Sequence, residues 1–399
     1  MTTIMIVAGE SSGELYGSLL AKALKSKWPD IHIMGVGGEK MSEAGVELIS
    51  SISDAFGLTE AISAFGKIKA AFNKTVEALK QCRPAVLVLI DYPDFNLKVA
   101  KLARSLGIKI LYYVSPQVWA WRKGRVKKIA CLVDRMAVIL PFEEEIYRNA
   151  GIPCEFIGHP VLEEIESVIG SSKSFGVQGS ALSEECRSFF KSNIGLEPNR
   201  PLLSLLPGSR PSELKRHLPL IIEVIRRFKR DPEISEKGYQ LCMPLTLNTD
   251  ETRYHSYLET LRQEGVVIKK GESVKVLAAS DLAVVASGTA TLQTAFLEVP
   301  MVVVYKLAQL TYQLGKRIIK VKHISLVNIL SGREVVQELI QDRANPGEIV
   351  KELKKIITDT KYREDMIHYY RKVKGPFSGK NPSQRVAEIV IEMAGGGHL

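Results

Sequence analysis

Short runs of β-branched and other apolar residues alternate with amphipathic stretches from the beginning of the chain. This alternation is typical of βα units, in which parallel strands form a buried sheet and helices cover it. We expect strands in the first half at Ile4–Val7, His32–Val36, Val86–Ile90, Ile108–Val114, Arg135–Ile139 and Glu155–Ile157. A second series is expected at Leu202–Leu206, Gln240–Met243, Val266–Ile268, Leu282–Val285 and Val302–Tyr305.

Between the two series, from about residue 163 to residue 200, the periodicity weakens into glycine, serine and charged residues. Such a composition is typical of a linker. The pattern therefore predicts an α/β protein of two doubly wound domains. We expect the first at 1–168, a linker at 169–200, the second at 201–374, and a final helical segment at 375–399.

Composition narrows the class of protein. No apolar stretch reaches the ~18 residues of a membrane span, and the start has no charged signal-peptide region, so we expect a cytoplasmic protein. Five scattered cysteines without a CxxC pair are expected as reduced thiols, and no metal site is predicted. The net charge of +10 favours anionic partners such as nucleotides, phospholipid surfaces or nucleic acid. The densest basic stretch, 121–128, lies in no recognisable RNA-binding module, so nucleic acid ranks lowest.

Open α/β sheets bind ligands beyond the carboxyl ends of their strands, which directs attention to the loops there. Residues 8–14, Ala-Gly-Glu-Ser-Ser-Gly-Glu, combine glycines that allow close backbone approach with serines that can cap a helix. Residues 112–122 combine aromatic and polar side chains that can contact a sugar and a phosphate. An ordinary turn and simple core packing remain the alternative interpretations of these two stretches.

Two aspartates follow the apolar run 86–90. Asp91 ends the predicted strand, where a partly desolvated carboxylate can serve as a general base. Asp94 follows a proline and precedes a helix, so we expect it to be an N-cap.

The second half repeats the arrangement of strand, glycine turn and helix twice. Gly208 and Ser209 expose backbone N–H groups, and Arg210 offers a fork of donors to a phosphate. Residues 286–292, Ala-Ser-Gly-Thr-Ala-Thr-Leu, again place hydroxyls at the start of a helix. Two such anion sites in one domain indicate a diphosphate ligand.

At these stretches the sequence resembles the lipid-A-disaccharide synthase family, inverting glycosyltransferases of the GT-B fold. The matching stretches are AGESSGE at 8–14, DYPDFN at 91–96, YVSPQVWAWR at 113–122, LPFEEEIY at 140–147, FIGHP at 156–160, LLPGSRPSE at 205–213, ASGTATLQ at 286–293 and SLVNILSGRE at 325–334. The resemblance implies two Rossmann-like domains that face a cleft, with C-terminal helices packing back towards the first domain. It also implies transfer from UDP-2,3-diacylglucosamine to 2,3-diacylglucosamine 1-phosphate (lipid X), which gives a β-1,6 disaccharide and UDP without a cofactor or metal.

By the same resemblance, two residues are catalytic. Asp91 is the base, and Arg210 contacts the donor phosphates. The donor-binding residues that it implies are Gly208, Ser209, Arg210, Ser287, Gly288, Thr289, Gln293 and Asn328. The acceptor-binding residues that it implies are Glu10, Ser12, Gly13, Ser115 and Trp121.

The chain departs from the family at Gln293, where a glutamate usually accepts hydrogen bonds from the donor ribose. A carboxamide loses the charge-assisted part of that contact, on the order of 1–2 kcal/mol. Gln293→Glu is therefore expected, from sequence alone, to tighten donor binding. Milder departures are Ser11, Glu14 and Val327, where the family usually has alanine, aspartate and proline.

Acylated substrates imply a peripheral site on the anionic inner face of the inner membrane. The stretch 55–72 mixes aromatic and basic residues at helical spacing, which suits interfacial docking, although a core-facing helix is the alternative. A homodimer is implied only by relatives that exchange C-terminal segments. Two rival functions remain open at this point: a non-hydrolysing UDP-sugar epimerase, and a catalytically impaired nucleotide-sugar or membrane-surface binder.

Overall fold

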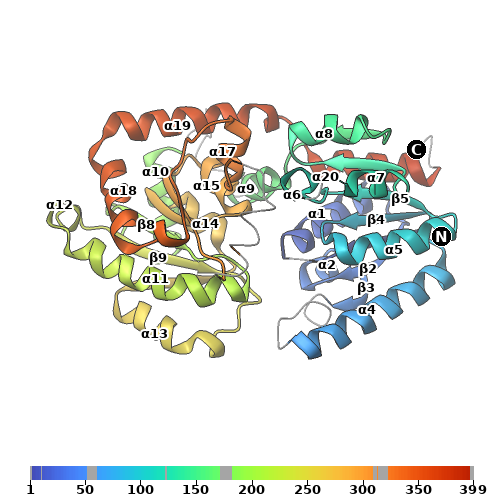
Figure 1. Cartoon of the computed structure of the whole chain (residues 1–399), viewed down its shortest axis with the longest axis horizontal. Coiled ribbons are helices and arrows are strands. Elements are labelled where there is room, and N and C mark those ends of the chain that lie inside the picture. The colour runs from blue at the N-terminus through green and yellow to red at the C-terminus, as the bar shows by residue number, and fades with distance from the viewer. Residues whose placement is uncertain are drawn as a thin grey trace. The chain divides into compact units, whose positions relative to one another are not determined.

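The computed structural model describes residues 2–9, 11–51, 61–121, 124–170, 182–308, 312 and 322–395. The chain forms two compact units (Figure 1). Unit 1 is Met1–Pro160 with Phe377–Leu399, and unit 2 is Val161–Pro376. Each unit is an α/β domain with its own parallel sheet, as the periodicity predicts.

Unit 1 contains seven parallel strands in the order β3-β2-β1-β4-β5-β6-β7. The strands are β1 (Thr3–Ala8), β2 (His32–Gly37), β3 (Glu47–Ser51), β4 (Val86–Ile90), β5 (Lys109–Tyr113), β6 (Arg135–Val138) and β7 (Cys154–Phe156). The helices are α1 (Ser11–Lys27), α2 (Glu39–Glu43), α4 (Ala61–Cys82), α5 (Pro93–Ser105), α6 (Val118–Trp121), α7 (Arg125–Ala130), α8 (Pro141–Arg148) and α20 (Pro382–Ala394).

Helices cover both faces of this sheet, and β4 is therefore buried along its whole length. Alternate strand residues such as Leu87 and Leu89 form one core with α4, α5, α7 and α8. The intervening residues point to the opposite face, where α1 and α20 pack on each other and on the central strands. In Figure 1 the red C-terminal helix α20 accordingly lies among the blue and cyan elements of unit 1.

Unit 2 repeats the plan with six parallel strands in the order β10-β9-β8-β11-β12-β13. The strands are β8 (Leu202–Leu206), β9 (Gln240–Leu245), β10 (Val266–Lys270), β11 (Leu282–Ala286), β12 (Met301–Tyr305) and β13 (Glu338–Ile340). The α-helices are α9 (Pro160–Gly170), α10 (Glu184–Asn193), α11 (Pro211–Arg230), α12 (Pro232–Ser235), α13 (His255–Gln263), α14 (Ser273–Ala278), α15 (Thr289–Phe296), α17 (Leu326–Ser331), α18 (Pro346–Thr358) and α19 (Thr360–Lys374). The 3₁₀ turns are η1 (Thr252–Tyr254), η2 (Gln341–Arg343) and η3 (Gly375–Phe377).

The chain passes between the units at Pro160–Val161 and again at Pro376–Phe377, whereas the sequence pattern places the boundaries near 168 and 375. Helix α10, inside the expected linker, belongs to unit 2. It is fastened there by Arg187, which donates to the carbonyl oxygen of Ser280, and by Lys191, which pairs with Asp281 at 2.9 Å. The charged composition of this segment thus reflects polar anchoring of a helix.

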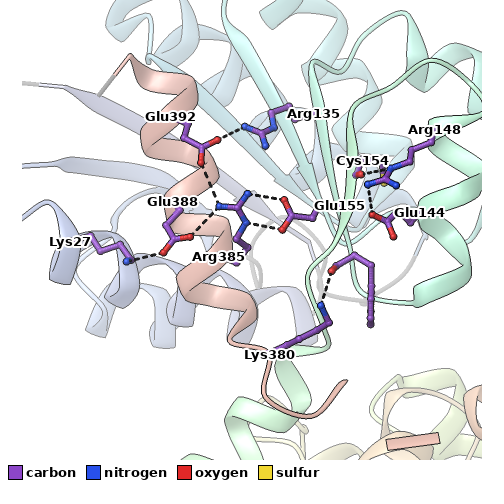
Figure 2. A network of polar contacts seen from close by, with 11 residues as sticks. Lys27, Arg135, Glu144, Arg148, Cys154, Glu155, Lys380, Arg385, Glu388 and Glu392 are labelled. Atoms are coloured by element: carbon purple, nitrogen blue, oxygen red, sulfur yellow. Dashed lines mark hydrogen bonds and ion pairs between the residues drawn. The ribbon is translucent and has the colours of Figure 1, made fainter. Parts of the chain in front are cut away.

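Ion pairs join α20 to the other elements of unit 1 (Figure 2). Arg385 makes a bidentate contact with Glu155 of β7, at 2.7 and 2.9 Å, and a further bond to Glu388 at 3.1 Å. The other pairs of the network are Lys27–Glu388 at 3.1 Å, Arg135–Glu392 at 2.6 Å and Arg385–Glu392 at 3.4 Å. Together these contacts join the last helix to α1, β6 and β7.

Arg385→Met is expected to lower the free energy of unfolding by about 1 kcal/mol at pH 7, because the pair is more than a third exposed and solvent screens it. Arg385 holds the pKa of Glu155 below its usual range. A carboxyl with a lowered folded pKa contributes stability above its unfolded pKa of about 4.3, and this is lost as pH falls through the folded pKa. Urea unfolding at pH 7 and pH 3 measures both expectations.

The matched control is Arg104→Met, which removes one exposed pair with Asp134 and should change the free energy of unfolding by less than about 0.5 kcal/mol. If Arg385→Met matches this control at pH 7, or keeps its full effect at pH 3, the account of the network is wrong.

Candidate functional site

In a doubly wound sheet, ligands bind beyond the carboxyl ends of the strands where the strand order reverses. The reversal lies between β1 and β4 in unit 1 and between β8 and β11 in unit 2. The loops after these four strands begin at Gly9, Asp91, Pro207 and Ser287. They are the loops that the sequence analysis selected.

Asp91 lies in a strained turn at the end of β4. Asp91, Tyr92 and Val114 have φ angles of 51°, 38° and 66°, a left-handed conformation that costs a non-glycine residue about 1–3 kcal/mol. The carbonyl oxygen of Asp91 accepts from Nδ2 of Asn96 and from the Tyr112 hydroxyl, each at 2.7 Å. These two buried side chains hold the strained turn in place. Strained turns are frequent at active sites, so the geometry is compatible with the functional role expected for the half-buried Asp91.

Asp94 is not the N-cap of α5, contrary to the sequence-based prediction. Tyr92 occupies the N-cap position, and Asp94 lies in the first turn, where it pairs with Arg125 at 2.5 Å. The left-handed turn at Asp91 and Tyr92 shifts the start of the helix to Pro93. Asp94 is 74% exposed, so it is a surface carboxylate.

The loop after β1 approaches the Asp91 turn closely. The register pairs Ala8 with Ile90, and a Cβ on Gly9 would lie 2.4 Å from Cβ of Tyr92, so only glycine fits. Ser12 is half-buried and Gly13 buried in the first turn of α1, while Glu10 lies outside the described residues. Ser12 and Gly13 therefore lie at the start of α1, where a Cβ on Gly13 would be 3.5 Å from the side chain of Ile90, the residue before Asp91.

The neighbouring Glu14 has an internal partner. Its buried carboxylate accepts from the backbone N–H of Lys40 at 2.9 Å. The glutamate that stands where the family usually has aspartate therefore stabilises the start of α2.

The loop after β5 is held by a buried carboxylate that the sequence analysis did not single out. Glu143 of α8 accepts from the Ser115 hydroxyl at 2.7 Å, from Nε1 of Trp119 at 3.1 Å and from the N–H of Leu140 at 3.2 Å. Burial raises the pKa of Glu143 to about 7, against the lowering effect of these hydrogen bonds. The backbone of Trp121 ends α6, and its side chain is outside the described residues.

In unit 2, the backbone N–H groups at the N-terminus of α11 already have a hydrogen-bond partner within the protein. The N–H groups of Ser209 and Arg210 both donate to the Glu213 carboxylate, at 3.1 and 3.2 Å. Gly208 has a φ of 101°, and a Cβ there would lie 2.3 Å from the same carboxylate. The Arg210 side chain remains 53% exposed, 3.7 Å from Glu213, so its guanidinium can reach an anion.

The N-terminus of α15 is open by comparison. Its N-cap residue Gly288 is exposed, a Cβ added there would meet no described atom within 4 Å, and the first turn contains no acidic residue. Thr289 is half-buried at the first helical position, and Ser287 donates its hydroxyl to the carbonyl oxygen of Ile324 at 2.9 Å. The first N–H groups of a helix have no intrahelical partner and carry its positive dipole end, so this turn can bind an anion.

Gln293, one turn further along α15, has a carboxylate beside it. Its Nε2 donates to Oε2 of Glu164 of α9 at 2.7 Å. Residues at i and i+4 share one face of a helix, and 289 and 293 are about 6 Å apart along the axis. The family usually has a carboxylate at position 293. In this chain the carboxylate of Glu164 lies beside that position instead.

Both polar atoms of the Asn328 side chain make hydrogen bonds within unit 2. Its Oδ1 accepts from the N–H groups of Val335 and Val336, and its Nδ2 donates to Val336 and to the carboxylate of Glu338. Glu338 also accepts from Ser325 and the N–H of Ile324. The side chain of Asn328 thus shapes the loop between α17 and β13, and a direct bond from it to the donor stays a prediction.

His217 of α11 is a second buried group that the sequence analysis missed. Its Nδ1 donates to the carbonyl oxygen of Pro207 at 2.7 Å, and its Nε2 accepts from the N–H of Lys306 at 3.0 Å. Burial lowers its pKa, so the ring is neutral and joins the loop after β8 to the end of β12. The sequence signal is a histidine on the apolar face of an amphipathic helix, which alone does not reveal its partners.

The described part of α4 follows the core-facing interpretation. Phe72 packs edge-on against Phe95 at 5.8 Å, and Ile68 contacts the same core, while Lys67 and Lys69 are exposed. Residues 55–58 of the proposed docking stretch lie outside the described residues. Among the helices of the described part of the chain, none is long and apolar enough to cross a membrane.

Known solved structures share this fold at low sequence identity. The UDP-GlcNAc 2-epimerase from Neisseria meningitidis bound to UDP-GlcNAc superposes with a TM-score of 0.69 at 11% identity, covering 98% of this chain and 100% of that one. A glycosyltransferase from Rickettsia africae superposes with a TM-score of 0.54 at 14% identity, covering 98% of each chain. These likenesses confirm the expected fold class of two Rossmann-like domains.

Sequence relatives are far more similar. The family model described as lipid-A-disaccharide synthetase matches residues 4–390. The lipid-A-disaccharide synthase of Geobacter metallireducens is 39% identical over 395 residues, which cover 98% of this chain and 97% of that protein. That of Trichlorobacter lovleyi is 38% identical over 392 residues, with the same coverage. Because these matches extend through both units, the chain belongs to the lipid-A-disaccharide synthase family and is a hexosyltransferase.

Proposed function

We propose that this enzyme transfers the sugar of UDP-2,3-diacylglucosamine to 2,3-diacylglucosamine 1-phosphate, forming the β-1,6-linked lipid A disaccharide and releasing UDP. The observation that carries the proposal is the family match over residues 4–390, which includes the switch-point loops of both units. The epimerase alternative shares only the fold, at 11% identity, against 38–39% for the synthases. The impaired-binder alternative rested on Gln293, and Glu164 supplies a carboxylate at that position.

The acceptor half of the chemistry is assigned to unit 1. Asp91 removes the proton from the acceptor 6-hydroxyl as the oxygen attacks the anomeric carbon, and inversion requires only this one base. The hydrogen bonds that Asn96 and Tyr112 donate to the backbone carbonyl oxygen of Asp91 hold this turn in one conformation, so the Asp91 carboxylate keeps its position during the reaction. The residues assigned to the acceptor sugar and phosphate by resemblance are Glu10, Ser12, Gly13, Ser115 and Trp121, of which Ser115 is buried and donates its hydroxyl to Glu143.

The donor half is assigned to unit 2. The open N-terminus of α15 and the exposed guanidinium of Arg210 stabilise the negative charge that builds on the departing diphosphate as the bond from the anomeric carbon to the phosphate oxygen breaks. The hydroxyl of Thr289 and the N–H groups near Gly288 orient the phosphates. Ser209 contributes its hydroxyl, because its N–H already donates to Glu213.

The test is incubation of the purified protein with both acylated substrates in detergent, followed by mass spectrometry. The proposal predicts a disaccharide and one UDP for each disaccharide formed. Conversion of the UDP-sugar to an epimer without acceptor, or no product while UDP still binds, would overturn it.

Both proposed substrates carry acyl chains and therefore reside in a lipid bilayer. We propose that the enzyme reaches them by binding peripherally to a surface of anionic lipid. The net charge of +10 is attracted to such a surface by roughly 1 kcal/mol per basic residue close to it. Sedimentation with vesicles should show binding to anionic but not to neutral lipid, with loss of binding as salt is raised. Equal binding to both vesicles would contradict this.

A further inference from the structure

The loop after β5 is fastened to the first two turns of α8 by more than one kind of contact. In addition to the bonds that Glu143 accepts, the hydroxyl of Tyr147 donates to the carbonyl oxygen of Pro116 at 3.3 Å. The ring of Trp119 packs edge-on against Phe142 at 5.1 Å. Among these groups, Glu143 is the only one that binds both ends of the loop, Ser115 and Trp119.

This loop lies directly beside the Asp91 turn. The register pairs Ile90 with Tyr113, and the N–H of Asp91 donates to the carbonyl oxygen of Val114 at 3.3 Å, so Ser115 follows the residue that touches Asp91. A displacement of the loop therefore changes the surface next to the catalytic base. Groups that hold such a surface in place contribute to orientation of the reactants, because a misplacement of about 1 Å can lower the rate about 10²-fold.

We propose that Glu143 is a positioning residue, whose buried carboxylate holds residues 115–119 against α8 and so fixes the acceptor surface beside Asp91. The inference rests on the function proposed above. Glu143 is 1% exposed, so it acts through Ser115 and Trp119, not by touching substrate. A carboxylate that accepts several hydrogen bonds makes them stronger than a neutral group would.

The charge of Glu143 should matter near neutral pH. Its neighbours are Ser115 and Trp119 from the loop after β5, Tyr147 from its own helix and, near Tyr147, Cys154 from β7. Burial raises the pKa of Cys154 to about 12 and that of Tyr147 further, so both stay neutral while Glu143, with a pKa of about 7, titrates. Above pH 7 the ionised form holds the loop, and below pH 7 protonation weakens the bonds to it.

The experiment compares wild-type enzyme with Glu143→Gln, which resembles the protonated form in shape and charge. At pH 8 the variant should show kcat/KM for the acceptor lowered about fivefold, the loss expected when charge-assisted bonds become neutral ones. As pH falls to 6, the wild-type value should fall towards that of the variant. The affinity for UDP, measured by calorimetry, should stay unchanged, because the donor is assigned to unit 2.

Glu145→Gln is the matched control, since Glu145 is exposed on the same helix, and it should behave as wild type at every pH. Trp119→Phe removes one donor to Glu143 but keeps a ring against Phe142, and it should raise the acceptor KM at pH 8 even if Glu143→Gln unfolds. A wild-type to Glu143→Gln ratio that does not change with pH, or an acceptor KM unchanged in Trp119→Phe, would overturn the proposal. If wild-type enzyme forms no disaccharide, the proposed function fails instead.

Discussion

Asp91→Asn should lose most turnover, about 10²- to 10⁴-fold in kcat, which is the contribution expected of a general base. Asparagine has the same shape but cannot accept the proton of the attacking hydroxyl. It also tolerates the left-handed conformation at φ 51°, so the turn should remain intact. Disaccharide formation measured by mass spectrometry gives the rate, and thermal unfolding and UDP calorimetry should give wild-type values.

Asp94→Asn is the matched control, because Asp94 lies three residues further on, is exposed and pairs with Arg125. It should leave kcat within about twofold, since an exposed pair contributes under about 1 kcal/mol to stability. An Asp91→Asn enzyme with a kcat near wild type would remove Asp91 from the role of base. A comparable loss in both variants would mean that the first helical turn of α5, and not the base, was disturbed.

The strands that sequence predicted best are the fully apolar ones. Val86–Ile90 and Leu202–Leu206 have the expected bounds, because both faces of a central parallel strand are buried and only apolar residues fit there. The edge strands β3 and β13 were missed. Residues 47–51 are half-exposed and include Glu47, and 338–340 are three residues that begin with a buried glutamate, so neither segment has the apolar signal of a strand.

The loops of the site could be predicted, but the partners of their side chains could not. Strand ends and glycine turns in the sequence place Asp91 and Gly288 just after strands, and the observed strand order then puts these two strands at the switch points. The contacts that complete the loops join residues 28 apart in Ser115–Glu143 and 129 apart in Gln293–Glu164. Such pairs depend on which helix faces which strand end, and the pattern of apolar and polar residues along the chain does not show that arrangement.

The pair Gln293–Glu164 reverses an expectation drawn from sequence. Alone, Gln293→Glu should tighten donor binding by restoring the family carboxylate. Glu164, however, lies 2.7 Å from the amide nitrogen that the substitution would turn into an oxygen. Two carboxylates at that distance repel each other unless they share a proton, and their added negative charge would also repel a diphosphate.

We therefore expect Gln293→Glu to weaken UDP binding about tenfold at pH 8, equivalent to about 1.4 kcal/mol. The effect should shrink as pH falls and the pair takes up a proton, because one of two coupled carboxyls has a raised pKa. Calorimetry with UDP at pH 8 and pH 6 measures this. Glu166→Gln, an exposed position on the same helix as Glu164, should leave the affinity unchanged.

The double variant Gln293→Glu/Glu164→Gln decides whether the carboxylate or its position matters. It exchanges the two groups and leaves one carboxylate hydrogen-bonded to one carboxamide, so UDP affinity should return to within about twofold of wild type. Glu164→Gln alone leaves two carboxamides and should weaken UDP binding, since no charged acceptor remains beside the donor. If the double variant binds UDP as weakly as Gln293→Glu, repulsion between the carboxylates is not the cause. If Glu164→Gln binds UDP as wild type does, the carboxylate beside α15 serves the fold and not the donor.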